Sequence, residues 1–110
     1  MKITRDKHLD YLRDLTIEQR PIADLKKNRR NARTHSKKQI RQVADSIKEF
    51  GFVNPIIITS DGRIIAGHCR YAGAILLGMS EVPTICIDHL NESQIRAYMI
   101  ADNRLAELAG

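Results

Sequence analysis

The chain has 110 residues, of which 43% are hydrophobic and 28% charged, and its formal net charge at pH 7 is +5. This length accommodates a single domain, and the composition is ordinary for a globular protein. No segment approaches the about 18 consecutive apolar residues of a membrane span, and the N-terminus has no apolar signal-peptide core, so we expect a cytoplasmic protein with no membrane partner.

The first elements along the chain carry few signals. Residues 1–14 are highly charged, and we expect a charged tail or a short helix there, followed by one domain over residues 15–110. Apolar and β-branched residues between 15 and 22 predict a first extended segment. Residues 24–36 are polar, basic and without periodicity, which predicts a loop.

A helix over residues 37–49 comes next. Ser36 and Gln39 have the S-x-x-Q spacing of a capping box, and apolar residues recur at helical spacing between 40 and 47. Gly51 is a natural stop for this helix.

A β-hairpin follows this helix. Residues 55–59 are apolar and β-branched, residues 60–62 read Ser-Asp-Gly, and residues 63–66 are again mostly apolar. This pattern predicts two short strands joined by a tight turn.

The last third of the chain predicts a helix, a strand and a helix. The first helix starts after Gly67 and ends at Gly78, and the strand covers residues 82–87, where Pro83 indicates an edge position. The final helix starts after the cap signature of Asn91. Its apolar residues continue to the end of the chain, so we expect a domain truncated at its C-terminus. The fold class is α+β, with a small mixed sheet and packed helices.

Basic residues concentrate in one segment. Eight of the 18 Lys and Arg residues fall between 26 and 41: Lys26, Lys27, Arg29, Arg30, Arg33, Lys37, Lys38 and Arg41. Such a block suits a polyanion, either nucleic acid or phosphates, although a solvated loop has the same composition. With few aromatic residues and no Trp, stacking platforms for single-stranded nucleic acid are poor.

Gly67 lies between a predicted strand and a predicted helix. The first amides of a helix have no intrahelical partners and carry partial positive charge, so this junction favours a bound anion or phosphate. His68 and Arg70 add donors beside it. The alternative is a capped turn whose polar side chains lie in solvent.

Two cysteines and four scattered histidines do not form a zinc pattern. Cys69 is at the start of a predicted helix beside Arg70, where the thiolate of a reactive cysteine would be favoured. The alternative for Cys69 is a small half-buried residue. Cys86 lies in an apolar strand, where we expect it in the core.

Asp102 and Asn103 are adjacent in the final helix. Their oxygen atoms are hard ligands that suit magnesium bound to a phosphate. The alternative is a polar stretch facing solvent.

Several motifs in order give the chain a family resemblance. They are N-x-R-x-H-S (31–36), S-I-x-x-F-G-F-x-x-P-I (46–56), D-G-x-I-I-A-G-H-x-R (61–70) and L-G-x-x-x-V-P (77–83). Together they resemble the N-terminal domain of the ParB family, which is related in fold to sulfiredoxin. The tail I-A-D-N-R-L-A-E-L-A-G looks most like ParB-like domains at the front of DNA methyltransferases and of phage- or plasmid-borne proteins.

The resemblance implies a nucleotide-binding domain that takes CTP or ATP with Mg²⁺. Gly67 and Arg70 match the first and last positions of the family's G-E-R-R motif, while His68 and Cys69 replace its middle residues. Losing the first arginine of that motif removes one phosphate contact. The base-facing strip corresponds to Gly51, Phe52, Asn54 and Pro55.

The family's E-N-x-x-R motif matches Asp102 and Asn103, but Ala106 holds its arginine position. Arg104 is the replacement that this helix offers. By resemblance, Asn103 would contact the metal and Asp102 would orient the attacking water of a Mg-dependent NTPase.

Four functional hypotheses follow. The first is a nucleotide-binding, ParB-like domain of a DNA-associated protein, which could form a homodimer. The second is a non-enzymatic DNA-binding or interaction module that uses the basic block from Lys26 to Lys38, as the N-terminal part of a DNA methyltransferase. The third is a nuclease, and the fourth is a thiol peroxide-repair enzyme that depends on Cys69.

Overall fold

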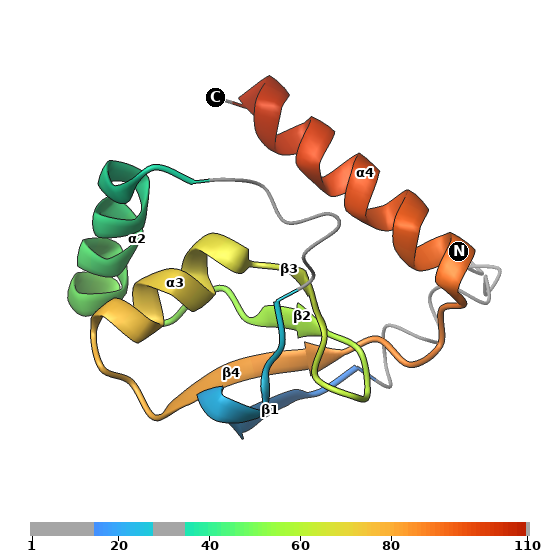
Figure 1. Cartoon of the computed structure of the whole chain (residues 1–110), viewed down its shortest axis with the longest axis horizontal. Coiled ribbons are helices and arrows are strands. Elements are labelled where there is room, and N and C mark those ends of the chain that lie inside the picture. The colour runs from blue at the N-terminus through green and yellow to red at the C-terminus, as the bar shows by residue number, and fades with distance from the viewer. Residues whose placement is uncertain (1–14, 28–34, 110) are drawn as a thin grey trace, which may run out of the picture.

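The computed structural model describes residues 15–27 and 35–109, without the side chains of residues 103 and 105–109. The described elements are β1 (Ile17–Pro21), a 3-10 turn (Ile22–Asp24), α2 (Lys37–Phe50), β2 (Ile56–Ile58), β3 (Ile64–Ala66), α3 (His68–Leu76), β4 (Glu81–Cys86) and α4 (Glu92–Ala109) (Figure 1). The predicted α+β class is confirmed. The tail or helix expected over residues 1–14 lies outside the described residues.

The four strands form one mixed sheet in the order β1-β4-β2-β3. β1 is antiparallel to β4, β4 is parallel to β2, and β2 is antiparallel to β3. The edge position predicted from Pro83 is therefore wrong. β4 pairs with β2 only from Thr84 onward, so at Pro83 its only partner strand is β1. The N–H that proline lacks therefore removes no hydrogen bond to β2.

The two faces of the sheet are covered by different helices, because successive strand residues point to opposite sides. The cluster on the α3 face consists of Leu25, Ile56, Ile58, Ile64, Ala74 and Val82. The cluster on the other face consists of Ile65, Ile87, Ile95 and Met99, the last two from α4. α2 packs against α3 (Figure 1).

Reciprocal caps begin both α2 and α4. The Gln39 amide donates to Ser36 Oγ at 3.1 Å, and the Ser36 amide donates to Gln39 Oε1 at 3.0 Å. Asn91 and Gln94 make the same pair of bonds, each 2.9 Å long. These bonds pair amides that would otherwise have no partner at a helix start, which explains why both starts can be predicted from local sequence.

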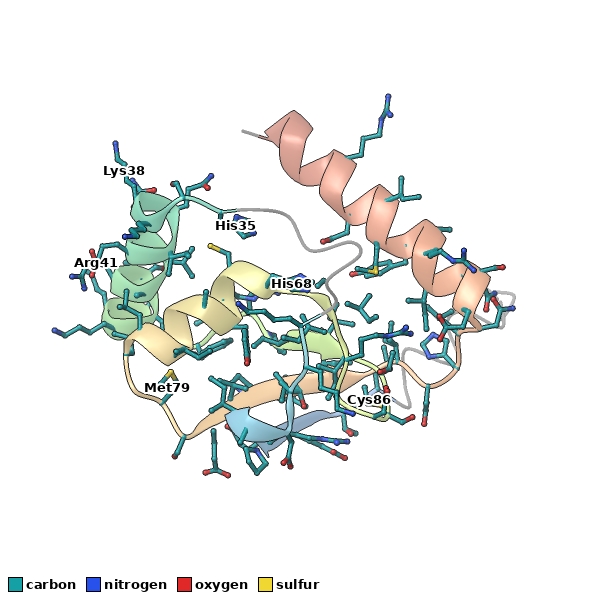
Figure 2. All side chains as sticks on the ribbon, in the orientation of Figure 1. His35, Lys38, Arg41, His68, Met79 and Cys86 are labelled. Atoms are coloured by element: carbon teal, nitrogen blue, oxygen red, sulfur yellow. The ribbon has the colours of Figure 1, made fainter. Side chains whose placement is uncertain are left out.

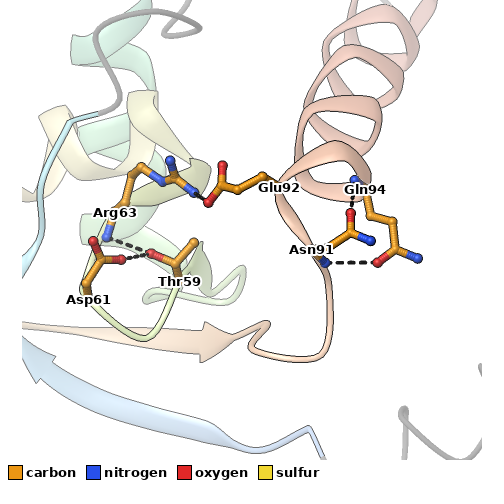
Figure 3. A network of polar contacts seen from close by, with 6 residues as sticks. All are labelled: Thr59, Asp61, Arg63, Asn91, Glu92 and Gln94. Atoms are coloured by element: carbon orange, nitrogen blue, oxygen red, sulfur yellow. Dashed lines mark hydrogen bonds and ion pairs between the residues drawn. The ribbon is translucent and has the colours of Figure 1, made fainter.

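An ion pair joins the β2–β3 turn to the first turn of α4 (Figure 3). Arg63 Nη2 lies 2.8 Å from Glu92 Oε1. The Arg63 amide donates to Thr59 Oγ1 at 3.2 Å, and that hydroxyl donates to Asp61 Oδ1. The N-terminal end of α4 is thereby tied to the hairpin that leads into α3.

The outer edge of β3 is covered by the segment that begins the basic block. The Lys26 amide donates to the Gly62 carbonyl at 2.8 Å, and the Ile64 amide donates to the Lys26 carbonyl at 2.9 Å. Lys26 and Arg63 form a parallel bridge. At Lys26 the backbone therefore runs in the same direction as β3, whose end leads to the start of α3.

Within the described parts of the chain, none of the helices combines the length and the apolar character needed to cross a bilayer.

Candidate functional site

Gly67 forms the junction between β3 and α3. Its φ of 103° is in the left-handed region, which a residue with a side chain adopts only at a cost. A Cβ atom at this position would also lie 2.9 Å from Arg70 Nη2. Both observations explain why glycine is needed here. The first amides of α3, directly after Gly67, have no partners within the helix.

Arg70 is half-buried and folds back over Gly67. Its Nη2 donates to the Pro55 carbonyl at 3.1 Å, which joins α3 to the segment after α2. Its Nε atom is buried and makes no hydrogen bond to any described residue. Burial lowers the pKa of Arg70, while the negative charge of Asp102 and the nearby Tyr98 and Cys69 raise it. Residues from α3, α4 and the 51–55 segment therefore meet at this guanidinium.

His68, the first residue of α3, is half-buried as well. Its Nε2 atom is buried and, among the described residues, has no hydrogen-bond partner. Burial lowers the pKa of His68 below its ordinary value of 6.5, and the nearby His35 and Lys27 lower it further. His68 is therefore mainly neutral at pH 7.

A cavity of about 230 Å³ lies beside Arg70. Gly51, Phe52 and Asn54 of the predicted strip line it, and Pro55 takes part through its carbonyl bond to Arg70. Val53 and three residues of one face of α2 complete the lining: Val43, Ser46 and Ile47. These α2 residues were not predicted as part of the site, although their spacing of three and four places them on one face of the helix and could have indicated them.

The acidic end of the predicted site lies on α4. Asp102 is half-buried, and its charge acts on both Arg70 and Tyr98. Arg104 is exposed, and the side chain of Asn103 lies outside the described residues. The structure brings Asp102 to Arg70, whereas it gives no contact between Arg104 and the start of α3.

The donor set offers magnesium little protein coordination. In the described part of the chain, no group of three or more His, Cys, Asp and Glu side chains could hold a metal ion. Asp102 is the carboxylate at this site, and it already balances the charge of Arg70. Such a donor set suits only a magnesium ion that takes most of its ligands from a bound phosphate and from water, the usual mode for this ion.

The basic block is divided by the structure. Lys27 acts on His68, whereas Lys38 and Arg41 project from the outer side of α2 (Figure 2). Lys26, Lys27, Lys37 and Lys38 are all exposed. Arg29, Arg30 and Arg33 lie outside the described residues. The first turn of α2 holds no acidic residue, so Lys37 and Lys38 work against the helix dipole, and helix stability does not explain them.

Neither cysteine fits a nucleophile. Burial raises the pKa of the Cys69 thiol, and the positive charge of Arg70 lowers it by a smaller amount. The expectation of a favoured thiolate is therefore wrong, and Cys69 is the half-buried residue of the alternative interpretation. Cys86 packs against the core on the α3 face but is only partly buried, because it is the last residue of β4.

A second cavity, of about 330 Å³, lies at the far end of the sheet. Thr59, Asp61, Arg63, Asp88 and Glu92 contribute its polar lining. The lining contains carboxylates as well as the Arg63–Glu92 ion pair. It shares no residue with the site around Gly67. Of its polar groups, Arg63 and Glu92 pair with each other and connect the β2–β3 turn to the first turn of α4.

Comparison with known proteins defines the class. Residues 7–103 match the ParB N-terminal domain, and the chain belongs to this family. The ParB-like nuclease domain-containing protein YnaK of Escherichia coli (strain K12) is 45% identical over 80 residues, which are 73% of this chain and 92% of that protein. The chromosome-partitioning protein Spo0J of Thermus thermophilus is 26% identical over 81% of this chain, but this chain spans only 35% of its length.

Solved structures show the same fold. The C-terminally truncated chromosome-partitioning protein ParB of Caulobacter crescentus, complexed with CTP-gamma-S, matches with a TM-score of 0.71 and 25% identity over 80% of this chain and 52% of that one. Sulfiredoxin from Arabidopsis thaliana matches with a TM-score of 0.62 at 18% identity, over 76% of this chain and 97% of that one. The predicted relation to both folds is confirmed.

Proposed function

We propose that this domain binds a nucleoside triphosphate, CTP or ATP, and that it is the nucleotide-binding part of a cytoplasmic, DNA-associated protein. The observation that carries the proposal is the half-buried Arg70, folded over Gly67 with a buried Nε atom that no described residue pairs. Unpaired buried donors beside a helix start are costly alone and favourable with an anion. The CTP-gamma-S complex of the Caulobacter relative supports the same ligand class.

The two halves of the nucleotide would occupy different parts of the site. The phosphates would bind at the first amides of α3, at His68 and at the Arg70 guanidinium. The base would enter the 230 Å³ cavity, where Phe52 supplies an apolar surface and Asn54 an amide. The ring amide and carbonyl groups of a base suit such a mixed lining.

We propose hydrolysis as a further step of this function. Magnesium, held mainly by the phosphates, would neutralise charge on the transferred group, and Asn103 would complete its ligands. Asp102 would orient the attacking water, a positioning role that phosphoryl transfer requires. Release of inorganic phosphate by the unmodified protein, and its loss in Asp102→Asn with nucleotide binding retained, would support this step.

Thermal unfolding with and without nucleotide tests the binding proposal. We expect CTP or ATP with Mg²⁺ to raise the melting temperature, because a ligand of the native state at a hundred times its Kd adds about 2.7 kcal/mol of stability. Arg70→Ala should abolish the shift, whereas Arg96→Ala, at an exposed position on α4, should keep it. No shift with millimolar CTP, ATP or GTP would contradict the proposal.

A second candidate function is DNA binding without nucleotide. Lys37 and Lys38 support it, because they are exposed on a helix start that they do not stabilise. Its affinity for duplex DNA should fall steeply with salt and be insensitive to CTP and ATP. Replacing Arg29, Arg30 and Arg33 together with Ala should abolish it, whereas Arg70→Ala should not.

Incubation with the same duplex DNA tests the nuclease hypothesis, since the name of the Escherichia coli relative contains the word nuclease. The described residues hold no group of three or more His, Cys, Asp and Glu side chains that could bind a metal ion. We therefore expect DNA to be recovered intact after incubation with Mg²⁺ or Mn²⁺. We also propose an association with a DNA methyltransferase and a phage or plasmid origin, which the coding region downstream of residue 110 would test.

A further inference from the structure

Three cationic or titratable side chains from separate segments converge at the start of α3. Lys27 follows Lys26, whose backbone runs parallel to β3 and in the direction of His68. His35 directly precedes the α2 cap at Ser36, and Figure 2 shows it above His68, which lies at the start of α3. Segments on either side of residues 28–34 thus meet one helix start.

The charges acting on His68 are all positive or able to become so. His35 and Lys27 lower its pKa, after burial as the main cause. On α3 itself, Cys69 and Arg70 come next, while Asp102 and Tyr98 of α4 act on Arg70. No carboxylate is among the groups that act on His68 in the described part of the chain. None of the groups that act on His68 therefore supplies the negative charge that a protonated histidine needs.

A bound phosphate would supply that counter-charge. We propose that His35, His68 and Lys27 form the subsite for the terminal phosphate of the bound nucleotide, and that His68 takes up a proton from solvent as the phosphate binds. This inference rests on the proposed nucleotide function. It gives a role to His35, a residue of the motif at 31–36 that has had none so far. It also implies that nucleotide binding depends on pH.

The sign of the dependence follows from linkage. The pKa of His68 lies below 6.5 in the free protein, and a nearby phosphate raises it, so the bound state holds more protons at neutral pH. Affinity therefore increases as the pH falls toward the histidine range. For one proton, the increase approaches about tenfold per pH unit within the window between the two pKa values.

Histidine ring NMR measures this directly on the unmodified protein. The pKa values of His35 and His68 are determined from pH 8.0 to 5.5, first without ligand and then with saturating CTP, CDP or CMP. We expect CTP to raise the pKa of His68 and CMP, which lacks the terminal phosphates, to leave it nearly unchanged. Equal pKa values with and without CTP, or an equal rise with CMP, would overturn the inference while nucleotide binding itself stands.

Calorimetry with variants gives the second measurement. The dissociation constant for CTP is determined between pH 8.0 and 6.5, above the range where the terminal phosphate itself takes up most of its proton. His68→Asn and His35→Asn should flatten the pH dependence, whereas His89→Asn, in the β4–α4 loop, should keep it. A slope that His68→Asn leaves unchanged overturns the inference, and no binding of any nucleotide at any pH overturns it together with the proposed function.

Discussion

Arg70 and Pro55 are joined across the domain by a hydrogen bond of 3.1 Å from the guanidinium Nη2 to the carbonyl oxygen. The bond connects the first turn of α3 to the segment that follows α2, although the two residues are far apart in sequence. One side chain therefore both closes the cavity beside α2 and covers Gly67.

Arg70→Lys should separate the effect of the positive charge from that of the hydrogen bond to Pro55. A lysine keeps the positive charge but not the planar fork that reaches Pro55. We expect the free energy of unfolding to fall by about 1.5–3 kcal/mol, the usual contribution of a hydrogen bond that involves a charged group. Urea titration measures it, and an unchanged midpoint would show that the bond to Pro55 contributes nothing.

Gly67→Ala should destabilise the fold more than an alanine at another left-handed glycine. At Gly67 the new Cβ would meet the Arg70 guanidinium, whereas at Gly78 it would meet no atom within 4 Å. Left-handed backbone alone costs about 1–2 kcal/mol for a residue with a side chain. The two melting temperatures, compared side by side, isolate the Arg70 contact, and equal losses in both variants would argue against it.

Glu92→Gln should have a small, salt-dependent effect. Its side chain is largely exposed, so the ion pair with Arg63 contributes less than about 1 kcal/mol, together with a favourable position at the start of α4. We expect the difference from the unmodified protein to shrink in 1 M NaCl, since salt screens exposed charges. A loss of several kcal/mol would mean that this contact controls the whole of α4.

Cys69 should react slowly with iodoacetamide at pH 7. Burial raises the pKa of its thiol, and the thiolate is the reactive form, so the rate should rise steadily with pH through the alkaline range. Cys69→Ser should keep the nucleotide-induced thermal shift. Rapid labelling at pH 7 that is lost in this variant would return the thiol-enzyme hypothesis to consideration.

Sequence patterns predict the helices and the hairpin well because their signals are local. The Ser36–Gln39 and Asn91–Gln94 pairs contain both partners of each cap within four residues. The place of β4 in the sheet is different, because it depends on β2, which pairs with β4 across the α3 crossover. The edge prediction from Pro83 is therefore wrong, even though Pro83 itself lies at a position of β4 that does not pair with β2.

The site could be predicted only in part, for the same reason. Gly67 and Arg70 are neighbours in sequence, and their family motif identifies them. The approach of Lys27 and His35 to His68 depends on the bridge at Lys26 and on the path of α2, which no local pattern reveals. The protonation of Cys69 depends on a balance between burial and the Arg70 charge, which only the folded structure decides.

Whether Arg70 holds a nucleotide can be measured by isothermal titration of CTP with Mg²⁺ into the unmodified domain, Arg70→Ala and Arg96→Ala. We expect saturable binding of one nucleotide per chain, retained in Arg96→Ala and weakened by at least tenfold in Arg70→Ala, where a charge-assisted contact to phosphate is lost. Binding of equal strength in all three proteins, or no binding of CTP or ATP to the unmodified domain, would contradict it.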